Sequence, residues 1–203
     1  MLYNIKKYVS IFLSKLRWMG WKHPLWFVLG PRDWKLDGWD ITRIINLVEP
    51  GDIIITRVDG FVSTWLLPGF WNHAGVVTNN NGLYTSVVHS TAEGVHESHM
   101  FDFLRADHVI VLHANWKKFP NLGVEASQLA SGYAQAAAEY DFNFDFTDSG
   151  KFSCTELAAA CYPDKIKARK GWFGRKILVA DDIVALADNQ DADFQVAREI
   201  RHA

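Results

Sequence analysis

The stretch Phe152-Ser153-Cys154-Thr155-Glu156-Leu157 predicts the first turn of a helix that carries a cysteine. Ser153 and Glu156 have the spacing of a capping box, in which each side chain bonds the backbone amide of the other residue. Cys154 would then lie at the positive end of the helix dipole, among amides without an intrahelical partner. Such a position stabilises a thiolate and can offer an amide to an oxyanion. The stretch therefore predicts either a nucleophile or an inert buried thiol, since buried free cysteines are common.

Length and composition favour one globular domain with a terminal extension. The chain has 203 residues, with 21 basic and 23 acidic side chains. This balance predicts no nucleic-acid-binding surface. Cys154 and Cys161 are seven residues apart on one expected helix, about 10 Å along its axis, which is too far for a disulfide. No Cys-x-x-Cys pair occurs, so we expect no metal and no cofactor.

The N-terminal stretch, residues 1–22, predicts a basic amphipathic helix. Apolar residues recur at helical spacing, and lysines and arginines occupy much of the remainder. The stretch is too short to span a bilayer and is not followed by the small-residue cleavage site of a signal peptide. It would either pack on the domain or lie on a membrane surface, where Trp18 and Trp21 would help to anchor it.

The border of the domain follows this stretch. We expect an N-terminal extension over residues 1–49, a short helix near Asp40–Leu47 capped by Asp40, and a domain over residues 50–203. Free thiols fit a reducing compartment, so we expect a cytoplasmic or membrane-peripheral protein. The border rests on a series of helix and strand breakers: Pro24, Gly30, Pro31, Gly38 and Pro50.

Apolar runs predict the strands, and one turn signal joins two of them into a hairpin. The alternation of aromatic and polar residues over 140–146 predicts an extended segment that leads to the Cys154 helix. Asn79-Asn80-Asn81-Gly82 is the turn signal of the hairpin. The expected strands are residues 53–55, 73–78, 83–90 and 109–112, and a helix is expected over residues 125–140.

The hairpin supplies a candidate base for the thiol. A tight turn at residues 80–81 would pair residues whose numbers sum to about 161 or 162, so His73 would face residue 88 or 89. His73 could then take the thiol proton, and His89 could fix the tautomer of the His73 ring. The candidate catalytic residues are therefore Cys154, His73 and His89.

Other polar and aromatic residues are weaker candidates. His96 and His99 flank Glu97, but this set lacks the geometry of a metal site. Three aromatic side chains before His73 would either wall a substrate cleft or fill the core: Trp65, Phe70 and Trp71.

Five segments carry a resemblance to a known family: Gly51-Asp52-Ile53-Ile54, Pro68-Gly69-Phe70-Trp71-Asn72-His73-Ala74-Gly75-Val76, Glu93-Gly94-Val95, Tyr140-Asp141-Phe142 and Ser153-Cys154-Thr155-Glu156-Leu157. In this order they resemble the permuted papain-like amidases of the YaeF/YiiX type. These enzymes belong to the NlpC-type cysteine peptidase superfamily, together with lecithin:retinol acyltransferase-like enzymes. A histidine that precedes the cysteine marks the permuted branch. The resemblance covers about residues 50–185.

The resemblance implies an α+β fold, with an antiparallel barrel-like sheet packed against the nucleophile helix. It implies that Cys154 is the nucleophile, His73 the base and His89 the third polar residue. Family members often carry Glu at this third position, while the acyltransferase branch can use His. The departure at His89 favours acyl transfer slightly.

Three functions are consistent with these residues. The first is a cysteine hydrolase that cleaves an amide in a small peptide-like substrate, cell-wall peptides included. The second is a lipid acyltransferase or (thio)esterase that acts at a membrane surface, with peripheral membrane contact through residues 1–22. The third is a non-catalytic binding module, because a fold does not determine a function.

Overall fold

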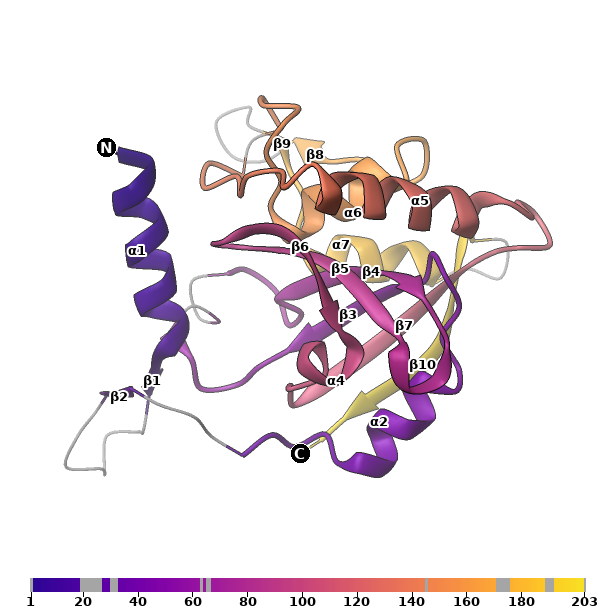
Figure 1. Ribbon diagram of the computed structural model, residues 1–203, viewed down its shortest axis with the longest axis horizontal. Helices are drawn as coiled ribbons and strands as arrows, with labels where there is room; N and C mark the ends of the chain where they lie inside the picture. The colour runs from indigo at the N-terminus through magenta and orange to yellow at the C-terminus, as the bar shows by residue number, and fades with distance from the viewer. Residues whose placement is uncertain are drawn as a thin grey trace.

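A six-stranded antiparallel sheet forms the centre of the fold (Figure 1). The computed structural model describes residues 2–18, 27–29, 33–62, 64, 67–144, 146–170, 176–188 and 192–202. The strand order is β10-β7-β3-β4-β5-β6. The strands are β3 (Ile53–Arg57), β4 (His73–Asn79), β5 (Ser86–Thr91), β6 (Gly94–His99), β7 (His108–Ala114) and β10 (Phe194–Arg201).

The central strand β3 explains why both faces of the sheet are covered. Successive side chains of a strand point to opposite faces. Ile53 and Ile55 accordingly belong to one hydrophobic core and Ile54 to another, and all three are fully buried. A run of three β-branched residues therefore needs an apolar layer on each side.

The first core lies under three helices, which Figure 1 shows on one side of the sheet. These are α5 (Leu122–Gln135), α6 (Cys154–Cys161) and α7 (Ala180–Val184), which the 3-10 helix η3 (Ala185–Ala187) follows. Leu157 and Ala158 of α6 are fully buried in this core. The helix that begins with Cys154 is thus held against the sheet by its apolar residues.

The second core lies on the opposite face. It is closed by α2 (Gly38–Ile45) and the short helix α4 (Met100–Phe103). The N-cap of α2 is Asp37 and not the expected Asp40, because Asp37 accepts hydrogen bonds from the amides of Trp39 and Asp40. Ile44, Ile45 and Val48 lie in this core although they precede residue 50. The domain border between residues 49 and 50 stays a prediction.

The expected α+β class is confirmed, and the sheet differs from the expectation in one respect. In the described part of the chain β10 pairs only with β7 and β6 pairs only with β5, so the sheet is open and not closed into a barrel. The smaller elements are the pair β1 (Leu16–Trp18) and β2 (Phe27–Leu29), the pair β8 (Arg169–Lys170) and β9 (Lys176–Ile177), and the 3-10 helix η1 (Gly82–Tyr84).

The N-terminal helix is shorter than expected. Helix α1 spans Leu2–Lys15, and the chain then forms strand β1 instead of continuing as a helix to residue 22. Trp21 lies outside the described residues. Within the described ranges, no helix has the length and apolar character needed to cross a membrane.

Candidate active site

Cys154 is the first residue of α6 and is partly buried. The expected capping box is present: the Ser153 hydroxyl accepts from the Glu156 amide at 3.3 Å, and the Glu156 carboxylate accepts from the Ser153 amide at 2.7 Å. The same carboxylate also accepts from the Phe146 amide at 3.0 Å. Because Glu156 satisfies these two amides, the helix start is fixed and Sγ has a defined place.

Three backbone amides lie close enough to the Cys154 sulfur to favour its thiolate. Two come from Cys154 itself and Thr155, at the start of α6, and the third comes from Ala74 on β4. Ala74 directly follows His73 in the sequence. The sulfur therefore lies near the backbone of the residue that follows the candidate base. The rings of His73 and His89, by contrast, contact Phe103 of the second core, on the opposite face of the sheet from α6.

A sharp turn places His73 at the start of β4. Gly69 has a φ of +96° at this turn. A Cβ at this position would lie 2.2 Å from a carboxylate oxygen of Asp181. That carboxylate accepts from the amides of Phe70 and Trp71, both at 3.0 Å. Only glycine fits this backbone conformation and this close approach. Asp181 of α7 thus fixes the turn from which His73 enters the sheet.

His73, His89 and Ser98 form a chain of hydrogen bonds across three neighbouring strands. His73 Nε2 lies 2.9 Å from His89 Nδ1, and His89 Nε2 lies 2.8 Å from the Ser98 hydroxyl. The structure thus brings His73 and His89 together. Ser98 was missed by the sequence analysis, because its position depends on how β6 aligns with β5.

The contact between the two histidines arises from a different register than the one expected. Gly75, and not His73, pairs with His89 across β4 and β5. The connection is longer than a tight turn, because the 3-10 helix η1 is inserted and β5 begins at Ser86. His73 lies two residues before Gly75 on the same face, so the rings meet diagonally.

Burial keeps the thiol and both imidazoles neutral. Desolvation, followed by repulsion from His96, lowers the pKa of His73 to about 4. Desolvation, followed by repulsion from His73 and His96, lowers the pKa of His89 to about 2. Desolvation also raises the pKa of the Cys154 thiol, against the effect of the three amides. Burial of the thiol therefore opposes the thiolate that the helix end was expected to stabilise.

The remaining histidines of the sheet have structural partners. The His96 ring lies 4.4 Å from the His89 ring, and its Nδ1 lies 3.0 Å from the carbonyl of Gly94. His99 caps α4 by accepting from the Phe101 amide. Asp59 and Asp52 lie within 2.9 Å and 2.7 Å of His108 and His113, respectively.

The three aromatic residues that were candidates for substrate binding differ in where they lie. Trp71 is 2% exposed and lies in the first core, so its side chain presents almost no surface. Phe70 packs edge-on against Trp71 and lies under the guanidinium of Arg57. Trp65 lies outside the described residues.

Tyr140 is a second residue near the thiol to which the sequence analysis gave no role. Burial, followed by the nearby charges of Cys154, Glu156 and Asp141, raises its pKa. The expected extended segment is interrupted, because Phe144 and Phe146 have φ values of 54° and 59°. These left-handed residues turn the chain. The alternation of residue types in the sequence therefore did not indicate that Tyr140 lies near the Cys154 thiol.

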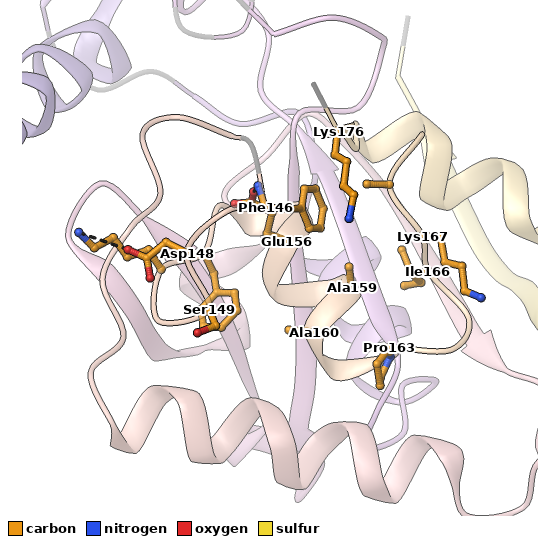
Figure 2. A pocket seen from close by; sticks show the side chains of 13 residues that line it. Phe146, Asp148, Ser149, Glu156, Ala159, Ala160, Pro163, Ile166, Lys167 and Lys176 are labelled. Atoms are coloured by element: carbon orange, nitrogen blue, oxygen red, sulfur yellow. Dashed lines mark hydrogen bonds and ion pairs between the residues drawn. The ribbon is translucent and has the colours of Figure 1, made fainter. Parts of the chain in front are cut away.

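A cavity of about 450 Å³ lies beside α6 but does not contain the thiol. Figure 2 shows Lys167 and Lys176 on one side of the helix and Asp148 and Ser149 on the other. Cys154, His73 and His89 are not among its lining residues, which are Phe146, Asp148, Ser149, Lys151, Phe152, Glu156, Ala159, Ala160, Pro163, Ile166, Lys167, Ala168 and Lys176.

Comparison with solved structures supports the fold. The chain is similar to a crystal structure described as metalloprotein YiiX from Escherichia coli O157:H7, with a TM-score of 0.55 and 14% sequence identity. The similarity covers 77% of this chain and 99% of that one. In the part of this chain that is described, no group of three or more His, Cys, Asp or Glu side chains could hold a metal ion.

Comparison with protein families identifies the enzyme class. No curated protein matches the chain. A family model does match residues 47–190, and its description is permuted papain-like amidase enzyme, YaeF/YiiX, C92 family. The match covers more than half of the chain and includes Cys154, His73 and His89. The chain therefore belongs to this family of permuted papain-like cysteine peptidases and amidases, and it is an enzyme of the cysteine hydrolase kind.

Proposed function

We propose that the protein cleaves an amide bond in a small peptide-like substrate, with Cys154 as nucleophile, His73 as base and His89 as its orienting partner. The hydrogen bond between His73 Nε2 and His89 Nδ1 is the observation that carries this proposal. It leaves Nδ1 as the ring nitrogen with which His73 can accept the thiol proton. The effect of the Ala74 amide on the pKa of the Cys154 thiol supports a position of the sulfur near the same strand end.

One arrangement of protons in the three-residue chain gives the tautomer that a base needs. If His89 donates from Nε2 to the Ser98 oxygen, its Nδ1 is an acceptor and receives a hydrogen bond from the His73 Nε2–H. His73 Nδ1 then carries a lone pair. In the opposite arrangement His73 Nδ1 would carry a proton and could not act as a base. Ser98 therefore acts as a positioning residue, through its effect on His89.

The reaction starts from a neutral pair. As the sulfur attacks the carbonyl carbon, the thiol proton passes to His73 Nδ1 and a carbon–sulfur bond forms. The Cys154 amide at the start of α6 stabilises the oxyanion. The oxyanion then collapses, the carbon–nitrogen bond breaks, and His73 gives its proton to the leaving amine. Water, deprotonated by His73, hydrolyses the thioester and restores the thiol.

Trapping of the acyl-enzyme tests this function. The protein is mixed with aminoacyl arylamides and with short- and long-chain nitrophenyl esters, quenched in acid and analysed by mass spectrometry. We expect the acyl mass on Cys154 within the tryptic peptide of residues 152–165. The Cys161→Ala variant should keep this adduct, because Cys161 is 2% exposed. An adduct confined to Cys161 or to lysines would contradict the proposal. Faster turnover of long-chain esters than of amides would favour lipid acyl chemistry instead.

Replacing Ser98 tests the tautomer argument. In Ser98→Ala the Nε2 proton of His89 loses its acceptor, so the inactive arrangement of the two rings becomes populated. We expect kcat to fall on the order of 10-fold with little change in KM, since about 1.4 kcal/mol corresponds to a factor of ten. Ser98→Thr, which keeps the oxygen, should retain most of the activity.

The control is Ser86→Ala, on the neighbouring strand. The Ser86 hydroxyl hydrogen-bonds Thr78 and Glu97 instead of His73 or His89. Equal kcat in the Ser98→Ala and Ser86→Ala variants would remove Ser98 from the mechanism. The proposed role of Cys154 would be unaffected by that result.

A further inference from the structure

Helix α1 exposes a row of large apolar side chains. At about 100° per residue, the row covers an arc of about 120° on the helix surface. Exposed patches of this kind mark interaction sites. The exposed fractions are 68% for Leu2, 51% for Ile5, 71% for Tyr8, 50% for Val9 and 51% for Phe12.

The side of α1 that carries Tyr3 and Lys6 attaches the helix to the domain. The Tyr3 ring contacts the Phe142 ring at 5.3 Å, and the Lys151 ammonium lies 5.3 Å from the Tyr3 ring. Lys6 Nζ donates to Asn143 Oδ1 at 2.6 Å. Figure 1 shows α1 beside the domain, clear of the helices that cover the sheet. These contacts leave the apolar arc turned towards solvent.

The N-terminal segment, residues 1–32, is more basic than the rest of the chain. Residues 1–32 contain no Asp or Glu, whereas the whole chain has 23 acidic and 21 basic residues. The other 171 residues therefore carry 15 basic and 23 acidic side chains. At 100° per residue, Lys6 and Lys15 lie at the two edges of the apolar arc. The six basic residues of the segment are Lys6, Lys7, Lys15, Arg17, Lys22 and Arg32.

We propose that α1 binds an anionic lipid bilayer, with the arc formed by Leu2, Ile5, Tyr8, Val9 and Phe12 in the boundary between headgroups and acyl chains. An apolar arc with a basic edge suits this position, because the ammonium of Lys15 can reach anionic headgroups while the apolar side chains are buried. The Lys6 ammonium instead bonds Asn143 of the domain. Attraction of the basic segment to the negative surface adds to this burial. A second copy of the chain fits less well, since pairing of two arcs would bring two basic segments together.

The attachment of α1 gives this binding a consequence for the active site. Phe142 contacts both Tyr3 of α1 and Tyr140, at ring distances of 5.3 Å and 4.8 Å. Tyr140 is in turn close to Cys154. A helix lying on a bilayer would therefore bring the Cys154 site towards the lipid surface. The binding itself does not depend on the proposed reaction.

Vesicle co-sedimentation of the full-length chain tests the proposal. Phosphatidylcholine vesicles are compared with vesicles of phosphatidylcholine and phosphatidylserine, at low and high salt. We expect binding to the anionic vesicles that weakens as salt rises. In the double variant Ile5→Gln and Phe12→Gln, we expect the partition coefficient to fall about 10-fold or more, because two apolar side chains no longer transfer.

The matched control replaces exposed apolar residues elsewhere. Leu83→Gln and Tyr84→Gln remove side chains that are 70% and 74% exposed on the connection between β4 and β5, and this variant should bind as the unchanged protein does. Lack of binding to both vesicle types would overturn the proposal. So would equal binding by the Ile5→Gln, Phe12→Gln variant. A dimer in light scattering that this variant abolishes, without vesicle binding, would show that a second copy covers the arc.

Discussion

Replacement of Cys154 by serine is expected to reduce turnover by about 10⁴-fold or more, which is the scale seen when a catalytic nucleophile is removed. Serine keeps the size and position of the side chain at the start of α6, but its hydroxyl is a much weaker nucleophile than a thiol. The neutral His73 would have to remove a proton from a far weaker acid. Steady-state hydrolysis of the best arylamide or ester, with circular dichroism as a check on folding, measures the effect.

Cys161 provides the internal comparison for this experiment. It lies on the same helix, but burial raises the pKa of its thiol to about 12, and it belongs to the first core. Cys161→Ala should therefore retain turnover and lose only some stability from a small cavity. Full activity of Cys154→Ser would contradict the nucleophile assignment. Equal loss in both variants would indicate a folding defect instead.

Replacement of His73 by alanine is expected to lower kcat/KM by about 10³-fold, within the range of 10² to 10⁴ attributed to general acid–base catalysis. Without the imidazole, the proposed acceptor of the thiol proton is missing. Because the pKa of the Cys154 thiol is raised by burial, the remaining activity should increase with pH through the alkaline range as the thiolate forms. In the unchanged protein the acidic limb should instead follow His73, whose pKa is lowered to about 4.

His113→Gln is the control for the loss of a histidine from the sheet. His113 bonds Asp52, and this hydrogen bond raises the pKa of its ring. Its contribution to stability is present below the ordinary histidine pKa and is lost as pH rises through the raised value. The variant should thus keep the pH profile of activity and lose stability mainly in acid. A pH profile of His73→Ala that matches the unchanged protein would exclude His73 as the base.

The start of α6 could be predicted because its determinants are local. Ser153 and Glu156 cap the helix from within four residues, and the structure has this box as expected. The state of the Cys154 thiol could not be predicted in the same way. It depends on desolvation by residues distant in sequence, which opposes the helix end and decides the direction of the pKa shift.

The pairing of His73 with His89 was predicted through an incorrect register. A four-residue turn signal was visible, but the insertion of η1 and the irregularity between Val77 and Asn79 moved the strands by about two residues. The rings still meet because both side chains lie on the same face. Ser98 and Tyr140 could not be found, since their places depend on the neighbouring strand and on a loop with left-handed residues.

The link between Asp181 and the turn at Gly69 has a consequence for the order in which the site is completed during synthesis. The carboxylate that holds the Phe70 amide is made 111 residues later in the chain. His73 and its hairpin leave the ribosome first, the thiol follows, and the residue that fixes the turn before His73 comes after both. Since chains fold from the N-terminus as they emerge, the nascent protein would carry the proposed base long before the proposed nucleophile. On the proposed mechanism, hydrolysis therefore requires the chain to be made at least as far as Cys154.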